Sequence, residues 1–392
     1  MGEPVRLDLV EYGHASLELQ PETVEHLSRH FSDAVTLSPR GGRKFHLEAN
    51  ARIGTIVAPE LEIRIRPKVP LRSLLYMLGH AYRLGKYRRE TIDQLERPDI
   101  RELLIVIFAG QVEDLVRRGL RQGYCEEEDE LQFLRGRVMV DQMIRRVPGR
   151  SLRTPCRYEE YSPNLIHNQI LRYTLEQLPV VMDANLVTRL QRLRHLLGEL
   201  RWRTFRIPEI RSVSYDRLTE HYRPLHALCE LLLSARGLEH EAGGYPMGSF
   251  LVDMNDLFEA FVARWFEDHL PRPYAVLTQH RTYLDRGRAI AIRPDLVVTR
   301  RGAACLVADT KYKRLKTSGP GNHDAYQVLA YCRVLGVRTG VLLYPTPAKN
   351  GRYVVRDGEN LIQTDGPGLS GEPVDVAREM GALVDRVVGL TG

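Results

Sequence analysis

The stretch AIAIRPDLVVTRRGAACLVADTK, residues 289–311, decides the fold of the last third of this chain. Its two apolar runs, 289–298 and 303–311, flank the segment Arg300-Arg301-Gly302. Apolar runs rich in Val, Ile and Leu on either side of a glycine turn predict two antiparallel strands joined as a hairpin. If the pairing is centred on Gly302, Asp295 lies directly opposite Asp309, so two carboxylates meet on neighbouring strands.

A lysine joins these two carboxylates. Lys311 follows Asp309 by two residues, so both side chains project from the same face of the strand. Opposed carboxylates repel unless they jointly hold a cation, and oxygen ligands suit Mg²⁺, with Mn²⁺ as a substitute. A metal ion and an ammonium together favour hydrolysis of a phosphodiester. We therefore predict that Asp295, Asp309 and Lys311 are catalytic, with both aspartates as metal ligands.

Neighbouring helices offer three supporting side chains. Glu259 lies at the border of the apolar stripe of a predicted helix, 256–270, where a charge needs a partner, so it is a candidate third metal ligand. Gln327 and Tyr331 are four residues apart on a second predicted helix and share a face. They would position a nucleic-acid strand or the lysine. Each of these residues would also suit an ordinary helix surface, and a lone Asp-x-Lys is common by chance.

The rest of the chain predicts an α/β protein of mixed α+β type. We expect a β-rich and partly helical region at 1–155, a helical connecting region at 156–240, and a mixed sheet flanked by helices at 241–392. The segment Gly243-Gly244-Tyr245-Pro246 is a candidate hinge. Periodicity gives strands at 5–9, 61–65 and 340–344, and helices at 99–116, 165–178, 186–200, 324–335 and 374–388, the first behind a capping-box pattern at 99–102.

Composition narrows the class of protein. The 392 residues carry a net charge of +6, and ten Lys or Arg against three Asp or Glu fall within 281–316. Only seven residues are Lys, and three of these are Lys311, Lys313 and Lys316. Five cysteines without metal-type spacing argue against a disulfide scaffold or a metal cluster. With no long apolar run and no basic leader, we expect a cytoplasmic protein without membrane contact.

The ordered set of acid, acid-x-lysine and Gln-x-x-x-Tyr matches the active-site pattern of the PD-(D/E)xK nuclease superfamily and resembles its RecB-like branch. Nearly the whole chain is similar, in the same order, to the McrC family. The second acid is Asp309 where Glu is more familiar, which changes reach and not charge. The upstream resemblance rests on Ile53–Val57, Leu61–Lys68, Leu74–Leu78, Arg118–Leu120, Tyr124, Leu134–Arg137, Cys156–Glu160, Asn164, Asn168–Leu171 and Leu257–Phe261.

The resemblance implies the Mg²⁺-dependent endonuclease subunit of a modification-dependent restriction system. Its partner would be an McrB-like hexameric AAA+ GTPase that recognises methylated cytosine in double-stranded DNA, and the N-terminal region of this chain would dock on that ring and stimulate it. The segment Gly79–Lys86 departs from a P-loop in spacing and lacks Ser or Thr after the lysine, so GTP would bind the partner and not this chain. A pair of nuclease chains would suit a double-strand break.

Two other functions fit the same residues. One is a stand-alone RecB-like repair or recombination nuclease, which would cut DNA without a motor. The other is a non-catalytic adaptor that stimulates the motor and keeps the nuclease fold as a scaffold. A middle-segment arginine cluster leaves three interpretations open, namely DNA phosphates, acidic surfaces of the motor, or a solvated face; it comprises Arg135, Arg137, Arg145, Arg146, Arg150, Arg153 and Arg157.

Overall fold

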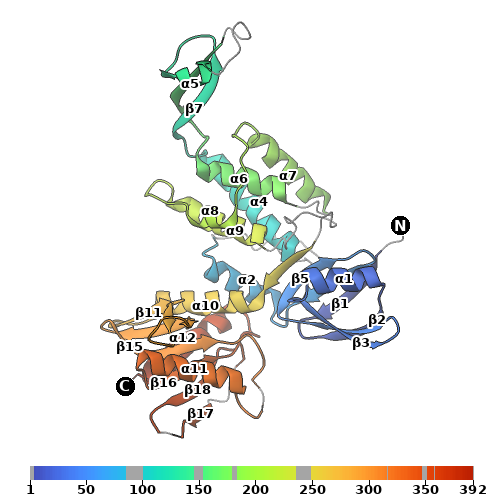
Figure 1. Ribbon diagram of the computed structural model, residues 1–392, viewed down its shortest axis with the longest axis vertical. Coiled ribbons are helices and arrows are strands. Elements are labelled where there is room, and N and C mark those ends of the chain that lie inside the picture. Colours follow the sequence, from blue (N-terminus) through green and yellow to red (C-terminus); the bar gives the residue numbers. More distant parts are fainter. Residues whose placement is uncertain are drawn as a thin grey trace. The chain divides into compact units, whose positions relative to one another are not determined.

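The computed structural model divides the chain into two compact units, Met1–Leu84 with Ala235–Gly392, and Gly85–Ser234 (Figure 1). It describes residues 4–84, 100–144, 153–178, 183–234, 249–315, 317–346, 351–356 and 358–391. The units do not follow the predicted boundary between 155 and 156. The N-terminal segment packs with the C-terminal third because a strand after the second unit returns to the N-terminal sheet.

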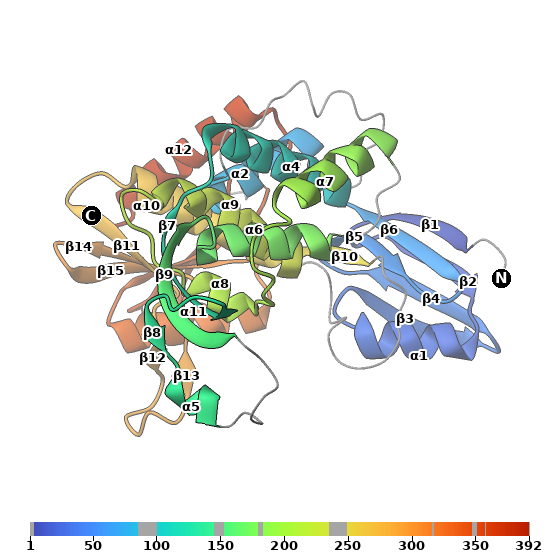
Figure 2. The same cartoon turned by 90° about the horizontal axis from the view of Figure 1, so that it is seen from above.

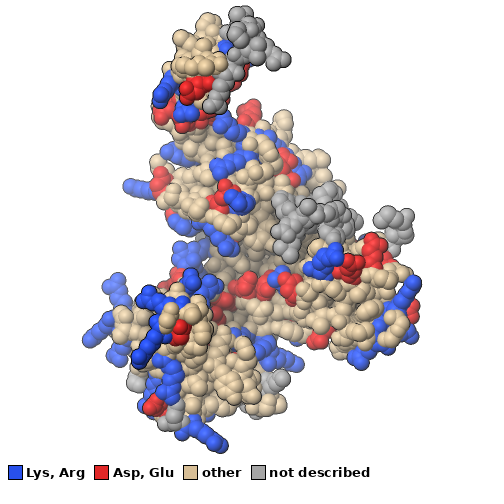
Figure 3. Space-filling model, in the orientation of Figure 1, with Lys and Arg blue, Asp and Glu red and all other residues tan. Residues whose placement is uncertain are grey.

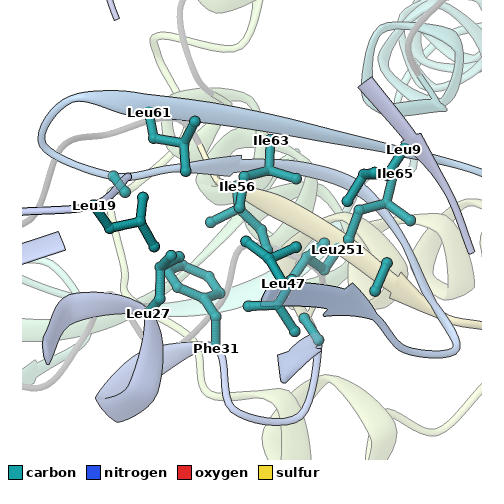
Figure 4. Packing of buried hydrophobic residues seen from close by; sticks show 14 residues of the cluster. Leu9, Leu19, Leu27, Phe31, Leu47, Ile56, Leu61, Ile63, Ile65 and Leu251 are labelled. Carbon is teal, nitrogen blue, oxygen red and sulfur yellow. The ribbon is translucent and has the colours of Figure 1, made fainter. Parts of the chain in front are cut away.

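The N-terminal part of the first unit is built from two small sheets and one helix. Alternation of apolar and charged residues puts Leu61, Ile63 and Ile65 into a core that also contains Leu27 from the helix and Leu47 from the other sheet (Figure 4). One sheet has the order β1 (Val5–Val10), β6 (Leu61–Arg66), β5 (Arg52–Val57) and β10 (Phe250–Asp253). The other comprises β2 (His14–Glu18), β4 (Lys44–Ala49) and β3 (Val35–Gly41), beside α1 (Pro21–His30).

Strand β10 ties the C-terminal third to this N-terminal part. It pairs antiparallel with β5, with Leu251 opposite Gly54. Gly54 has φ 132°, and a Cβ there would lie 2.0 Å from the carbonyl oxygen of Phe250, so only glycine allows the strands this close. The chain then enters α10 (Met254–His269), where Asp253 accepts a hydrogen bond from the Asn255 amide as the N-cap. The helix that carries Glu259 therefore begins on the N-terminal sheet.

The C-terminal part is a six-stranded mixed sheet between helices, as predicted. Its order is β11 (Tyr274–Thr278), β14 (Leu296–Arg300), β15 (Ala303–Thr310), β16 (Thr339–Leu343), β18 (Leu361–Asp365) and β17 (Gly351–Val354). The pairs β15–β16 and β16–β18 are parallel and the others antiparallel. Helix α11 (Asn322–Leu335) covers one side, while α10 and α12 (Pro373–Gly389) lie on the other (Figure 2). Helix α2 (Leu71–Ala81) packs on α10 and α12.

The predicted strand 289–298 is wrong in its middle. It divides into β13 (Ala291–Ile292), which pairs with β12 (Thr282–Tyr283), and β14, and residues 293–295 belong to neither. Pro294 has no amide hydrogen to offer a ladder, which explains why the strand breaks at this point. The break frees the segment that carries Asp295 from regular pairing.

The second unit is largely helical, with one small sheet. Helices α4 (Ile100–Arg118), α6 (Ile166–Gln177), α7 (Ala184–Leu196) and α9 (Arg223–Ser234) form its core. The three long predicted helices of this region are confirmed as α4, α6 and α7. The smaller elements are β7 (Gly123–Leu131), β8 (Arg137–Val138), α5 (Val140–Ile144), β9 (Thr154–Ser162), α8 (Ile207–Arg211) and η1 (Glu220–Tyr222).

The sheet β7-β9-β8 places two arginines of the predicted cluster beside carboxylates. Arg157 contacts Glu126 and Glu128 across the strands, and Arg135 lies 3.7 Å from Glu160. These contacts favour the solvated, internally neutralised face among the three interpretations. Arg145, Arg146 and Arg150 lie outside the described residues, as do Asp99, the first residue of the predicted capping box, and the candidate hinge at 243–246. Within the described ranges, no helix is long and apolar enough to cross a membrane.

Candidate active site

The hairpin β14–β15 sets the geometry of the site, and its register follows the prediction. Leu296 pairs with Ala308, and the next two pairs keep the same centre at Gly302. Near the turn the register shifts at a β-bulge after Val298, and the two turn residues Arg301 and Gly302 both have positive φ, 53° and 86°. The bulge compensates for a two-residue turn, so the strand ends still bring Asp295 and Asp309 to the same edge of the sheet.

Asp295 is tied to the end of the partner strand. Its Oδ2 accepts hydrogen bonds from the backbone amide and from the Oγ1 of Thr310, both at 2.7 Å. Thr310 stands between Asp309 and Lys311, so these two bonds fix the catalytic strand end relative to the first carboxylate. Sequence reasoning missed Thr310 because its role depends on the break at 293–295.

Asp309 and Lys311 form a close ion pair in which the carboxylate is buried and the lysine is partly exposed. Asp309 is 1% exposed, and the Lys311 Nζ lies 2.5 Å from its Oδ2. Burial and the charge of Asp295 raise the pKa of Asp309 to about 6. Burial acts to lower the pKa of Lys311, yet the facing Asp309 carboxylate raises it, and the net shift is upward. The structure thus brings together the two carboxylates and the ammonium at one point.

Helix α11 holds the lysine through two side chains. Lys311 Nζ donates to Gln327 Oε1 at 3.1 Å, and Gln327 Nε2 donates to the Tyr331 hydroxyl at 2.7 Å. The Tyr331 hydroxyl in turn donates to the carbonyl oxygen of Arg293 at 3.4 Å. This relay connects α11 to the segment before Asp295. Of the two predicted roles, positioning the lysine is therefore the one for which the structure shows contacts.

Glu259 lies within the electrostatic reach of both aspartates. Burial raises its pKa to about 7, and the charges of Asp295, Asp256 and Asp309 add to this shift, while Arg293 opposes it. A carboxyl group with such a pKa exchanges a proton near neutrality. The predicted position of Glu259 at the border of the buried stripe of α10 is consistent with its half-buried state.

The site suits a metal ion that is held by two carboxylates better than one that is held by three. Among the residues that the structure describes, no three His, Cys, Asp or Glu side chains are arranged to hold a metal, so Asp295, Asp309 and Glu259 do not form a ready three-ligand cluster. Mg²⁺ is commonly bound by one or two carboxylates and several waters, so two are enough. Asp309 Oδ2 is buried and already faces the Lys311 ammonium at 2.5 Å, so a metal ion held by Asp309 would lie beside that ammonium.

A junction with the N-terminal sheet anchors the residue after the lysine. The Tyr312 hydroxyl donates to Glu11 Oε1 at 2.9 Å, and the Tyr12 hydroxyl donates to the Tyr312 carbonyl oxygen at 2.5 Å. Glu11 is fully buried, and its Oε1 also accepts from the Lys68 amide at 2.6 Å. Burial raises the pKa of Glu11. No sequence signal pointed to this junction, because its partners lie about 300 residues apart.

A second lysine–aspartate pair lies next to the first. Lys313 Nζ is 2.7 Å from Asp324 Oδ2, and the Tyr344 hydroxyl donates to the same oxygen at 3.4 Å. Asp324 is 2% exposed and lies in the first turn of α11, where the amide groups of a helix favour a negative charge. Sequence analysis noted the cluster of lysines but not this pair.

Comparisons with known proteins identify a matching family model and a solved structure with a similar fold. A family model described as McrBC 5-methylcytosine restriction system component matches residues 47–345, most of the chain. A chain of the half-complex refined from a tetradecameric assembly of Thermococcus gammatolerans McrB AAA+ hexamers with bound McrC aligns with TM-score 0.63 and 20% identity, over 98% of this chain and 100% of that one. A chain of the T. gammatolerans McrBC complex aligns at TM-score 0.45 and 21% identity, over 66% and 86%, a likeness too low to support an argument. No curated protein matches the chain.

Proposed function

The chain belongs to the McrBC 5-methylcytosine restriction system component family, and from this premise we propose that it is the subunit that cleaves DNA in such a system. The observation that carries the proposal is the meeting of Asp295, Asp309 and Lys311 at one edge of the sheet. A structural role alone would not explain a buried carboxylate, Asp309, whose pKa is raised by burial and by the charge of Asp295.

Each residue has a defined task in the proposed reaction. Asp295 and Asp309 would hold Mg²⁺, which supplies neutralisation of phosphate charge and a bound water of lowered pKa. Lys311, held by Gln327, offers its ammonium to the non-bridging phosphate oxygens as negative charge develops on them. Glu259, whose pKa is raised to about 7, can take a proton from the attacking water or return one to the leaving oxygen.

The proposal for a partner is based on the similarity of this fold to that of a solved structure. This chain aligns along its whole length with a chain from an assembly of McrB AAA+ hexamers with bound McrC. We propose that it likewise binds a hexameric AAA+ motor, which would hydrolyse GTP and recognise methylated cytosine in double-stranded DNA. The nucleotide would bind the motor and not this chain, and two nuclease chains in one assembly would account for cutting both strands.

The test is cleavage of methylated DNA by the complete assembly with Mg²⁺ and GTP. Lys311→Arg keeps the charge but replaces a compact ammonium with a planar guanidinium, so we expect it to abolish cutting while GTP hydrolysis continues. Robust cutting by the wild-type chain without motor or nucleotide would favour the stand-alone nuclease. Motor stimulation without metal-dependent cutting in any assembly would favour the non-catalytic adaptor.

A further inference from the structure

Between β11 and β14 the chain leaves the sheet and forms a separate hairpin, residues 279–293, which we call the arginine hairpin. Its strands are β12 and β13, and they extend from the sheet on the side of α11 (Figure 2). The hairpin carries four arginines and a single acid, Asp285; the arginines are Arg281, Arg286, Arg288 and Arg293.

Hydrogen bonds to the Asp285 carboxylate order the loop of the arginine hairpin. The carboxylate of Asp285 accepts hydrogen bonds from the amides of Ala289, at 2.9 Å, and Ile290, at 2.8 Å. These bonds lower the pKa of Asp285, so its negative charge interacts with the amide groups of the loop. The Leu284 amide also donates to the Ile290 carbonyl oxygen at 2.9 Å, which places Leu284 and Ile290 side by side. Both are exposed, by 47% and 53%.

Three arginines of the hairpin lack the carboxylate partner that many other arginines of the described chain have. Exposed arginines elsewhere commonly contact a nearby carboxylate, as Arg29, Arg117 and Arg378 do within their own helices. Within the described part of the chain, neither Arg281, Arg286 nor Arg288 has an ion pair with a carboxylate. Lys and Arg side chains gather over the part of the first unit that carries β11 and β15 (Figure 3). Arg281 and Arg288 lie over the ring of Tyr283, 5.8 Å and 6.0 Å from its centroid, so their charges face an aromatic ring and no carboxylate.

Both ends of the arginine hairpin are joined to the candidate active site. The last pair of β11 and β14 is Thr278 with Leu296, and the next amide, that of Gln279, donates to the Asp295 carbonyl oxygen at 3.1 Å. At the other end the Arg293 carbonyl oxygen accepts from the Tyr331 hydroxyl. The hairpin therefore starts and ends beside the carboxylates where a scissile phosphate would lie.

We propose that the arginine hairpin binds duplex DNA and holds it against the carboxylates, with its arginines on phosphates and the Leu284–Ile290 pair in a groove. This proposal rests on the proposed function for the position of the scissile phosphate. A two-stranded ribbon fits the major groove, and exposed apolar side chains contact bases or sugars there. Its attachment to the active site favours DNA over an acidic protein, because the substrate must pass at this point.

The salt dependence of DNA binding tests the proposal without requiring cleavage. The full chain is titrated onto a fluorescent 30-base-pair duplex, without divalent cations, over a series of salt concentrations. The test variant is Arg281→Gln, Arg286→Gln and Arg288→Gln together. The matched control is Arg29→Gln, Arg117→Gln and Arg378→Gln, which removes the same charge from arginines that are paired within helices.

Each lost phosphate contact lowers the slope of log K against log salt by about 0.9, so we expect the test variant to lose roughly 2–3 in slope and the control almost nothing. Leu284→Ser with Ile290→Ser should weaken binding without a change in slope. Equal slopes for the test and control variants, or a wild-type chain that does not bind the duplex, would overturn the proposal. Unchanged DNA binding with lost capture of the motor would assign the hairpin to an acidic protein surface. A chain that shows the expected slopes but never cuts DNA would refute the nuclease assignment and leave only the DNA-binding role of the hairpin standing.

Discussion

The two lysine–aspartate pairs at the end of β15 look alike and are held in opposite ways. In both, a nearly buried carboxylate contacts a lysine within 2.5–2.7 Å. Asp324 lies in the first turn of a helix and also accepts from Tyr344, so its charge is well supported. Asp309 instead faces the charge of Asp295, and its pKa is raised to about 6. The Asp324 carboxylate is therefore supported by its surroundings, while the Asp309 carboxylate is disfavoured by burial and by Asp295 despite its contact with Lys311.

The largest expected difference between the pairs is in cleavage. Lys311→Ala should lower the rate of DNA cutting by about 10³-fold, since it removes a charge that acts on the developing phosphate charge. Lys313→Ala removes an ammonium only two residues away and should change the rate by less than about threefold. Rates of cutting under single-turnover conditions in the complete assembly would measure this. Similar losses for both variants would show that the strand needs positive charge in general and not Lys311 in particular.

Replacing each of the two aspartates by asparagine should change the stability of the protein in opposite directions. The folded state binds more protons at Asp309 than the unfolded state between about pH 4 and 6, so its contribution to stability falls as the pH rises through that window. Asp309→Asn should therefore raise the free energy of unfolding of the metal-free protein by about 1–3 kcal/mol at pH 8, with no gain at pH 4. Asp324→Asn should lower it by about 1–2 kcal/mol, since it removes a supported charge.

Urea unfolding in the presence of a chelator, at pH 4 and pH 8, gives these values for both variants. A destabilised Asp309→Asn protein at pH 8 would mean that Lys311 satisfies Asp309 as fully as Lys313 and Tyr344 satisfy Asp324.

The tyrosines that support the two pairs, Tyr331 and Tyr344, should show a smaller difference in their effects on cleavage. Tyr331→Phe removes the hydroxyl that accepts from Gln327, so the relay that holds Lys311 loses a member. We expect cutting to slow by about tenfold, with stability changed by about 1 kcal/mol. Tyr344→Phe removes a bond to Asp324 and should leave the cleavage rate unchanged. The ratio of rate loss to stability loss for each variant is the measurement, and equal ratios would rule out a positioning role for Tyr331.

The smallest expected loss of cleavage concerns the junction with the N-terminal sheet. Tyr312→Phe removes its hydrogen bond to the buried Glu11, although the Lys68 amide still donates to the same oxygen. A loss of about 1–2 kcal/mol in the free energy of unfolding is expected, together with a modest fall in cleavage because Tyr312 directly follows Lys311. Unchanged stability would show that this hydrogen bond contributes nothing to the contact between the N-terminal sheet and the catalytic strand.

Local sequence patterns predicted the center of the candidate site well. The register of β14 and β15 follows from two apolar runs around one glycine, and a residue spacing of two or four fixes which side chains share a face. Asp309 with Lys311 and Gln327 with Tyr331 therefore came from the sequence alone. The β-bulge after Val298 was not predicted, yet it preserved the register because it compensated for the short turn.

What could not be predicted depends on distant parts of the chain. β10 completes the N-terminal sheet after an excursion through the whole second unit, so a contiguous division of the chain missed it. The Glu11–Tyr312 bond and the Lys313–Asp324 pair require knowledge of which elements meet. The break at 293–295 had a visible cause in Pro294, but its use, to place Asp295 against Thr310, became evident only in three dimensions.

The most direct test of the central claim is to locate a manganese ion. Crystals of the chain soaked in Mn²⁺ would be examined by anomalous scattering, for the wild type, Asp309→Asn and Asp324→Asn. We predict one peak between the carboxylates of Asp295 and Asp309 in the wild type and in Asp324→Asn, and none in Asp309→Asn. A peak that persists at full height in Asp309→Asn, or a wild-type protein with no manganese at these carboxylates, would contradict the account.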